Sequence, residues 1–460
     1  MSYLLFWTRI PLLKLRKDEE RRIMKKDQKI YYIGRRSSDI STDFNANVAD
    51  TFFAGSITCY GDNRGGNISY NVISGIQLSD DDSIFGRRND AIYTKFISDQ
   101  CRNIAEKDPD ALFLPYSQYY ASKVPQELHD RVICCNNERV VQCLDSKINF
   151  RKIFRKQLPF PKYTIEKGAR ILQLIEEKII PYEREVVIQT EFGGGGEGSY
   201  IVRRETFTEE YAAWLKAEIK STVKYVVSEY VYNLCSVGVQ ILVSDDEIGI
   251  YPPSIQILNG PCYIGSDLYA FSLLDEDIKN ECTRIATRFG EILRDMESLN
   301  VGKETISGIR NRGFFGIDFI ISEPGSSPSV YVIETNPRFT GPVGLLNVLC
   351  YKAGIGSVFK HSFDCFTGKR ICFDDFRKIE PNGRKRYAEI VRDKGGQVVS
   401  LENESSNKEG LDQTVYQEEG LYSHAVFEEI KAFNVYDDRR ELKKYLLKNM
   451  KKRKTNQNQS

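Results

Sequence analysis

The sequence has 460 residues, of which 41% are hydrophobic and 28% are charged, and its formal net charge at pH 7 is +1. This length and composition are typical of two or three globular domains with buried cores. A net charge near zero gives no general attraction to nucleic acid or to anionic lipid, so we expect neither as a partner. The apolar residues 1–15 are interrupted by Arg9 and Pro11, which argues against a membrane span and against a cleavable signal.

Cysteine and histidine content limits the chemistry. The chain has eleven cysteines with no CxxC pair, and only three histidines, which are His129, His361 and His424. Since no secretory signal is recognisable, we expect reduced thiols and a cytoplasmic location. The scattered histidines argue against a zinc site and against a nucleophile triad. Any chemistry must therefore use carboxylates, amides, Lys, Arg and the backbone.

The first part of the chain alternates between predicted strands and helices. The expected strands are residues 29–34, 111–117 and 131–136, and the expected helices are residues 87–106 and 117–129. This alternation predicts an α/β unit with a parallel sheet over residues 28–144. No GxGxxG follows the first strand, so the Rossmann fingerprint is missing.

A second group of elements begins at residue 145. Residues 145–157 predict a helix that is capped by Asp145 and ends before the LPFP at residues 158–161. Further helices are expected near residues 169–179, 208–219 and from 275, and strands at residues 185–189, 200–203, 223–231 and 235–243. After about residue 370 the pattern weakens. We interpret residues 400–410 as a polar linker and the basic residues 443–454 as a solubilising end.

Three polar residues interrupt two apolar strands, at residues 313–322 (GFFGIDFIIS) and 330–336 (VYVIETN). Glu334 and Asn336 are two positions apart on the second strand and so share a face, and Asp318 lies on the first strand. If the strands pair through the intervening turn, the three side chains converge. Carboxylate and amide oxygens suit Mg²⁺. The alternative is a buried ion-pair network without a metal.

A glycine run lies between the strands expected at residues 185–189 and 200–203. It contains Gly193, Gly194, Gly195, Gly196 and Gly198. Backbone N–H groups in such a loop can approach phosphate oxygens closely, because no Cβ is present. This arrangement predicts a hairpin flap, and the alternative is a flexible linker of the same composition.

The run GIDFII…VYVIETNPRFTG resembles the metal-binding end of the ATP-grasp ligases, and the resemblance covers roughly residues 145–350. It is nearer to the biotin carboxylase and carbamoyl phosphate synthetase branch than to the D-alanine ligase branch. It implies an α/β chain in which an N-terminal parallel-sheet domain precedes a two-lobed α+β ATP-grasp domain. The implied cofactors are ATP and Mg²⁺, with Mn²⁺ as an alternative metal. The implied metal ligands are Asp318, Glu334 and Asn336, and the implied phosphate-contacting arginine is Arg338.

The resemblance also assigns the nucleotide side of the site. Lys147 matches the first nucleotide lysine, the glycine run matches the phosphate flap, and Gln256 resembles a ribose-side residue. The linker strand that receives adenine corresponds to Glu229, Tyr230 and Val231.

One position departs from the family pattern, which places a lysine on the strand before the flap where this chain has Gln189. Another cation must compensate if the protein is active. We expect Lys147 first, with Arg203 or Arg204 as substitutes.

The implied division is an extension at residues 1–27, an N-terminal domain at 28–144, an ATP-grasp domain at 145–370 and a C-terminal extension at 371–460. The implied reaction is ATP-dependent, peptide-like ligation of a small carboxylate to an amine through an acyl phosphate. A homodimer stays open.

Two other functions stay open. Gln189 motivates a catalytically silent ATP-binding or scaffold protein. A bicarbonate-using carboxylase is disfavoured, because the FTGPVGLLN that follows Arg338 lacks an acidic residue and a histidine.

Overall fold

A computed structural model describes the chain at residues 28–36, 52–60, 87–133, 136–196, 198–259, 262–272, 274–301, 304–322, 329–369, 371, 373, 385–391 and 398–404. The expected extension at residues 1–27 and the basic residues 443–454 lie outside these ranges. No helix in the described ranges is both long enough and apolar enough to cross a bilayer.

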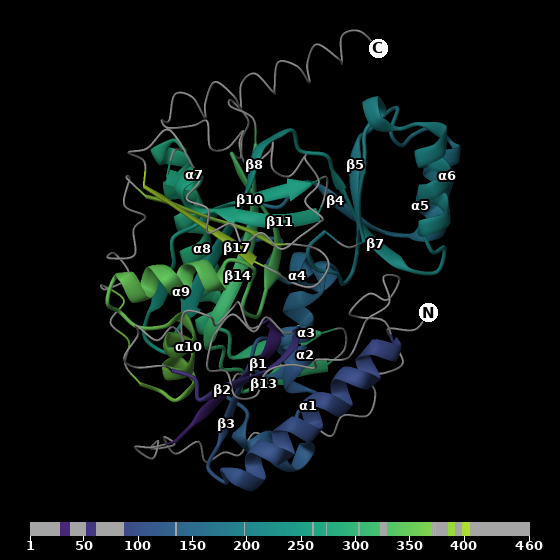
Figure 1. Cartoon of the computed structure of the whole chain (residues 1–460). Coiled ribbons are helices and arrows are strands. Elements are labelled where there is room, and N and C mark those ends of the chain that lie inside the picture. The colour runs from purple at the N-terminus through teal and green to yellow at the C-terminus, as the bar shows by residue number, and fades with distance from the viewer. Residues whose placement is uncertain are drawn as a thin grey trace.

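The N-terminal unit is a three-stranded parallel sheet, as the alternating pattern predicted (Figure 1). Its order is β2-β1-β3, with β1 at Ile30–Arg36, β2 at Gly55–Tyr60 and β3 at Leu112–Pro115. Helix α1 (Arg87–Lys107) packs on this sheet through Tyr93, Ile97, Cys101 and Ile104, which recur at helical spacing. Strand β2 was not predicted from the sequence.

Two expected elements of this unit differ from the prediction. In place of one helix at residues 117–129 there are a short α2 (Gln118–Ala121) and a 3₁₀ helix (Gln126–Arg131). The break follows from Pro125, because the residue before a proline is disfavoured in a helix. The strand expected at residues 131–136 is reduced to a single bridge between Val132 and Phe113 among its described residues.

Helices α3 (Glu138–Asp145) and α4 (Lys147–Phe154) meet at Ser146. The prediction that Asp145 caps the second helix is wrong. Asp145 ends α3, and the Ser146 hydroxyl caps α4 by accepting a hydrogen bond from the Asn149 N–H at 3.1 Å. Lys147 is therefore the first residue of α4.

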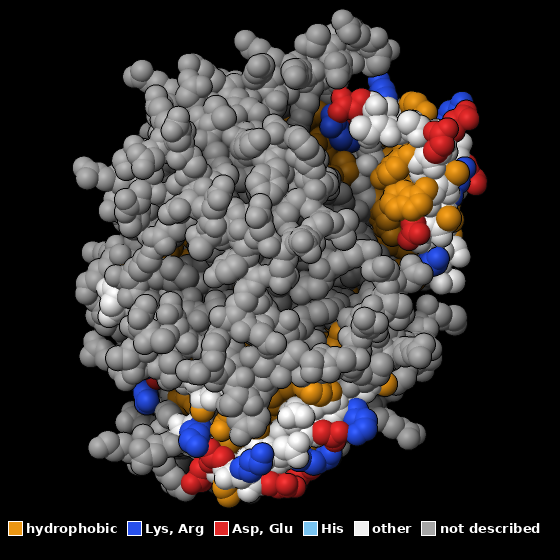
Figure 2. Space-filling model, in the orientation of Figure 1, with side chains coloured by type: hydrophobic (Ala, Val, Ile, Leu, Met, Phe, Trp, Pro, Cys, Tyr) orange, Lys and Arg blue, Asp and Glu red, His pale blue; other side chains and the backbone are white. Residues whose placement is uncertain are grey.

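A small antiparallel sheet follows, with the order β4-β7-β5-β6. Its elements are β4 (Tyr163–Lys167), α5 (Gly168–Glu176), β5 (Val186–Thr190), β6 (Ser199–Val202), α6 (Glu209–Glu218) and β7 (Lys224–Glu229). Helices α5 and α6 lie together on one side of this sheet and share one core with it (Figure 1). Figure 2 shows hydrophobic side chains on the surface of this lobe. Trp214 on α6 is one of the exposed large hydrophobic residues of the chain.

The large sheet has the order β15-β14-β8-β10-β11-β16-β17, and β9 pairs with β8. Its strands are β8 (Asn233–Val243), β9 (Ile248–Ile250), β10 (Ser254–Asn259), β11 (Cys262–Asp267), β14 (Gly313–Ser322), β15 (Val330–Asn336), β16 (Lys385–Val391) and β17 (Val398–Glu404). The interpretation of residues 400–410 as a linker is wrong for residues 400–404, because these pair with β16 in the sheet.

Helices cover both faces of the large sheet. They are α7 (Leu268–Ser272), α8 (Glu276–Arg294), α9 (Val343–Lys352) and α10 (Val358–Phe366), and a hairpin of β12 (Ser298–Val301) and β13 (Glu304–Ser307) follows α8. Along β14, Phe315 packs in the core that contains α8, whereas Phe314 packs in the core that contains α9 and α10. Since neighbouring strand residues face opposite sides, α8 lies on one face and α9 and α10 on the other.

Helix α4 is fixed by aromatic packing between the two sheets (Figure 1). The ring of Phe289 on α8 lies 5.9 Å from that of Phe150 and 5.4 Å from that of Phe154, both on α4. All three side chains are fully buried. This cluster holds the helix that carries Lys147.

We expect Phe289→Ala to lower the free energy of unfolding by about 3–5 kcal/mol, because it leaves a cavity in a packed aromatic cluster. The exposed neighbour Arg288 provides a control, and Arg288→Ala should stay within about 0.5 kcal/mol of the parent. Urea denaturation measures both. Equal losses for the two variants would contradict the packing described here.

Candidate active site

The three expected metal ligands lie on the hairpin of β14 and β15. Asp318 is directly opposite Glu334, whereas the next pair is Phe319 with Val332, so the register shifts by one residue and Ile333 forms a bulge. A shift of one residue exchanges the two faces of a strand. The side chain of Glu334 therefore lies on the same face as that of Asp318, and not on the core face where Val332 lies.

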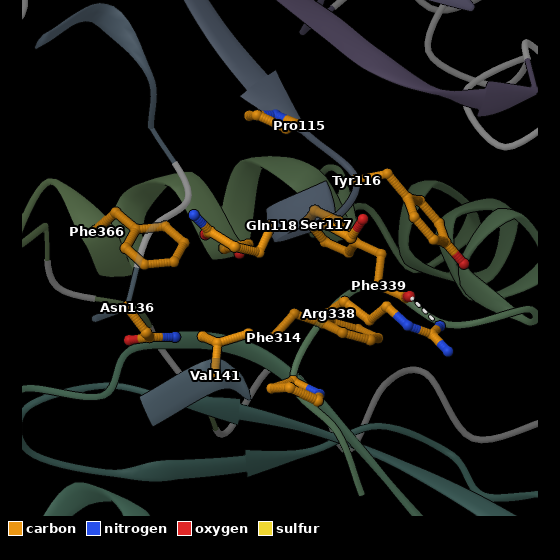
Figure 3. Close-up of a pocket in the computed structure, with 12 residues that line it drawn as sticks. Pro115, Tyr116, Ser117, Gln118, Asn136, Val141, Phe314, Arg338, Phe339 and Phe366 are labelled. Atoms are coloured by element: carbon orange, nitrogen blue, oxygen red, sulfur yellow. Dashed lines mark hydrogen bonds between the residues drawn. The ribbon is translucent and has the colours of Figure 1, made fainter. Parts of the chain in front are cut away.

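Hydrogen bonds connect this face to the residues that follow β15. The Asn336 amide donates to the Asp318 carboxylate at 3.0 Å, and its oxygen accepts a hydrogen bond from the Arg338 guanidinium at 2.8 Å. Arg338 also donates to the Phe339 carbonyl at 3.2 Å (Figure 3). Asp318, Asn336 and Arg338 therefore form one connected chain of polar groups.

The electrostatics of this face fit a divalent cation. Burial and, next, the Glu334 carboxylate raise the pKa of Asp318 to about 7. A cation between the carboxylates would relieve both effects. Within the described ranges no three His, Cys, Asp or Glu side chains are placed to hold a metal together. The two carboxylates instead suit Mg²⁺ or Mn²⁺, whose remaining ligands are water and substrate phosphate, whereas the Asn336 oxygen is here hydrogen-bonded to Arg338.

We call one face of the hairpin of β14 and β15 the metal face, after its expected ligands Asp318, Glu334 and Asn336. Lys147 lies between this face and the glycine loop. Its Nζ is 2.9 Å from the Glu334 carboxylate and donates to the Gly193 carbonyl at 2.7 Å. Its own backbone N–H donates to the Glu191 carbonyl at 2.9 Å. Lys147 is buried, and these contacts hold it beside both Glu334 and the glycine loop.

The glycine loop joins β5 to β6 and lies over Arg338. A Cβ added to Gly194 would stand 3.4 Å from the Arg338 guanidinium, and the Gly195 carbonyl accepts a hydrogen bond from the Tyr263 N–H on β11 at 3.1 Å. The φ angles of Gly195, Gly196 and Gly198 are +64°, +93° and +69°. This backbone favours glycine. The loop is therefore a hairpin flap between two paired strands.

Gln189 is next to last on β5, at the foot of this flap. Its amide oxygen accepts a hydrogen bond from the Arg151 guanidinium at 3.0 Å, and its nitrogen donates to the Ser199 hydroxyl at 3.3 Å. Arg151 was not identified from the sequence. The available signal was its spacing, because it follows Lys147 by four residues and so shares a face of α4 with it.

The other two cations expected to compensate for Gln189 have different partners. Arg203 lies over the rings of Tyr230 and Tyr232, 4.7 and 5.3 Å from their centroids, and forms an ion pair with Glu205. Arg204 donates to the Tyr182 carbonyl. These contacts place both arginines beside other groups, and their role as substitutes for the missing charge stays a prediction.

The expected adenine strand connects the small sheet to β8. The Glu229 N–H donates to the Lys162 carbonyl at 2.8 Å, and the Tyr230 N–H donates to the Glu185 carbonyl at 3.0 Å. Both N–H groups are thus used by neighbouring backbone. Val231 is the next residue along this connection, at the junction of the two lobes.

Two glutamines lie beside the metal face. A Cβ added to Gly238 on β8 would stand 3.3 Å from the Gln256 amide nitrogen, 3.4 Å from the Asp318 carboxylate and 3.5 Å from the Gln240 amide nitrogen. The expected residue Gln256 is therefore close to Asp318. Gln240 was not expected. It is buried, and its amide oxygen has no hydrogen-bond partner within the described part of the chain.

A pocket opens where the N-terminal unit meets the end of β15 (Figure 3). The Phe339 N–H donates to the Tyr116 carbonyl at 3.3 Å, which joins β15 to the loop after β3. The lining residues are Pro115, Tyr116, Ser117, Gln118, Asn136, Val141, Phe314, Pro337, Arg338, Phe339, Ser362 and Phe366. Arg338 is the only charged side chain among them.

Neither a protein-family model nor a curated protein sequence matches the chain. Several solved ATP-grasp enzymes share its fold. The biotin carboxylase domain of Hydrogenobacter thermophilus 2-oxoglutarate carboxylase, solved with MgADP and bicarbonate, has a TM-score of 0.53 at 14% identity and covers 79% of this chain and 74% of its own. The Aspergillus clavatus N5-carboxyaminoimidazole synthase with ADP and 5-aminoimidazole ribonucleotide has a TM-score of 0.50 at 12% identity, with coverage of 79% and 82%.

A third structure, the Thermotoga maritima phosphoribosylamine–glycine ligase, has a TM-score of 0.50 at 12% identity and covers 80% of this chain and 82% of its own. The chain has the ATP-grasp fold. At these identities the likeness concerns the fold alone, and it agrees with the arrangement expected from the GIDFII…VYVIETNPRFTG run.

The flap geometry can be tested with two alanine substitutions at similar φ. At Gly195 an added Cβ meets nothing within 4 Å, whereas at Gly198 it would stand 2.2 Å from the Thr190 hydroxyl. Both substitutions strain the backbone by about 1 kcal/mol or more, and Gly198→Ala adds a steric clash. We expect faster amide hydrogen exchange across residues 190–199 in Gly198→Ala than in Gly195→Ala. The reverse order would contradict the flap conformation.

Proposed function

We propose that the protein is an ATP-dependent ligase that joins a small carboxylate to an amine through an acyl phosphate and releases ADP and phosphate. The observation that carries the proposal is the cross-strand pair of Asp318 and Glu334, linked to Asn336 and Arg338, under a glycine flap in an ATP-grasp fold. The similar structures include a synthase, a carboxylase domain and a ligase, two of them solved with bound ADP, which supports a nucleotide-dependent reaction.

In this proposal the metal face holds the triphosphate. Asp318, Glu334 and Asn336 would hold Mg²⁺, which when bound neutralises phosphate charge during phosphoryl transfer. Lys147 exchanges its bond to the Gly193 carbonyl for a phosphate oxygen while it stays near Glu334. Val231 and its neighbours receive the adenine, and Gln256 faces the ribose side.

Arg338 is positioned to hold the oxygens that change charge. Its guanidinium is oriented by Asn336 and lies beneath Gly194, between the metal face and the pocket at the N-terminal unit. A planar guanidinium can bind a phosphoryl or carboxylate group through two hydrogen bonds. The carboxylate attacks the terminal phosphorus and ADP leaves, and the amine then displaces phosphate from the acyl carbon. The closed flap keeps water from the acyl phosphate.

No protein nucleophile is required in this scheme, because positioning and charge neutralisation supply the rate. This is consistent with the few histidines. It is also consistent with the buried thiols of Cys101, Cys282 and Cys365, whose pKa values are raised by burial well above the range of reactive cysteines. The proposal includes a cytoplasmic location and small-molecule substrates.

One experiment tests the proposal directly. The protein is incubated with Mg·ATP and with pools of carboxylates and amines, and ADP release is followed. Release that needs both pools supports the ligase. If the protein binds nucleotide but produces no ADP with any pool, the second candidate is supported. This candidate is a catalytically silent nucleotide-binding protein, which Gln189 favours. Release that needs bicarbonate alone would indicate the carboxylase.

We expect Glu334→Gln to reduce ADP release by about 10²–10³-fold, because the variant removes a metal-binding charge and keeps the side-chain volume. Glu281→Gln, on the solvent side of α8, is the matched control and should keep the parental rate. A Glu334→Gln protein that keeps more than about a third of the parental rate would contradict the assignment of Glu334 as a metal ligand.

The flap should respond to nucleotide. Hydrogen exchange of residues 190–199 should slow when Mg·ATP is added, because phosphate oxygens accept hydrogen bonds from the flap N–H groups. Helix α5, which lies in the same lobe, serves as an internal reference and should not change. If the flap exchanges equally fast with and without Mg·ATP, the glycine run is a flexible linker and not a phosphate-binding flap.

A further inference from the structure

Arg151 is a buried cation with no carboxylate at ion-pair distance among the residues that the structure describes. Its side chain is 1% exposed. Within the described residues, its guanidinium donates to two neutral groups, the Gln189 amide oxygen at 3.0 Å and the Lys147 carbonyl at 3.3 Å. Its Nε has no hydrogen-bond partner within the described ranges. Burying a charge in this way is costly unless a ligand compensates for it.

The surroundings fix this guanidinium at the foot of the flap. The rings of Phe160 and Tyr163 lie 5.9 Å from it, and Gln189 connects it to Ser199 at the start of β6. Burial lowers the pKa of Arg151 to about 10, and Glu334 acts in the opposite direction. The arginine therefore remains charged at neutral pH and contributes positive potential on the side of α4 that also carries Lys147.

The neutral residue at position 189 has a physical reason in this arrangement. A lysine there would place a second cation at hydrogen-bond distance from the Arg151 guanidinium, in a buried site where like charges repel strongly. An amide avoids this repulsion, and its oxygen accepts a hydrogen bond that orients the guanidinium. The positive charge at the foot of the flap is thus supplied by helix α4 and not by strand β5.

We propose that Arg151, oriented by Gln189, binds the diphosphate portion of the nucleotide. This inference rests on the proposed function, because it names a further ligand-binding residue of the same site. It assigns Gln189 the role of a positioning residue. It also predicts that Gln189→Lys should weaken nucleotide binding, although a lysine at this position is the family pattern.

A charge-relocation cycle tests the assignment by titration of Mg·ADP. Arg151→Gln should raise the Kd for ADP about 10- to 100-fold, because a hydrogen bond to a charged group is lost. Gln189→Lys should also raise it, through repulsion. The double variant Arg151→Gln/Gln189→Lys moves the charge to β5 and should recover most of the loss. Arg155→Gln, at the exposed C-cap position directly after α4, is the matched control and should not change the Kd.

Titration with adenosine, which has no phosphate, shows whether Arg151 contacts phosphate or has a purely structural role. If Arg151 contacts phosphate, the single variants weaken ADP and leave adenosine unchanged. If the variants weaken both ligands equally, or if the double variant recovers nothing, the inference is overturned while the proposed function stands. If the parental protein binds no Mg·ADP at all, the proposed function fails and this inference fails with it. The melting temperature of each variant identifies any that does not fold.

Discussion

The site depends on one irregularity in strand pairing. Val330, Val332, Glu334 and Asn336 alternate along β15, and in a regular strand all four would point to one face. The bulge at Ile333 divides them, so that the two valines enter the core with α8 and the two polar residues join Asp318. Without this shift, two polar side chains would be buried against α8 with no partners, which would be costly. The bulge therefore serves both the core and the site.

The charged side chains around this face include two carboxylates and three cations. Asp318 and Glu334 face each other, and Lys147 offsets part of their charge through its contact with Glu334. Arg338 is tied to them through Asn336, and Arg151 stands one turn behind Lys147. The raised pKa of Asp318 and the absence of an anion at Arg151 within the described ranges have one explanation in common. A metal ion and a polyphosphate together would satisfy the carboxylates and the surplus cations at once.

The sequence predicted the parts of this site that depend on local pattern. Both strands of the hairpin that carries Asp318 and Glu334 have the expected bounds, and these two side chains converge as expected. The bulge was not predicted, because strand alternation assumes a constant register. The cap at Ser146 was missed because Asp145 is an equally good cap by composition, and the choice between them depends on where α3 ends. Arg151 was missed because its importance arises from burial against β5, a contact that the spacing within one helix does not reveal.

Arg338 lies between the N-terminal unit and the part of the chain to which we assign nucleotide binding, and its position indicates a different role for each. On one side it is held by Asn336 and covered by the flap, both of which belong to the nucleotide half. On the other side it borders a pocket whose opposite wall is the loop after β3, and the Phe339–Tyr116 hydrogen bond fixes the distance between these walls. The rest of the lining is aromatic, aliphatic, amide or hydroxyl, so an incoming carboxylate meets no like charge there. Under the proposed reaction, the large sheet and the flap determine that a phosphoryl group is transferred. The N-terminal unit determines which molecule receives it, because it forms the wall that a substrate must contact to reach Arg338.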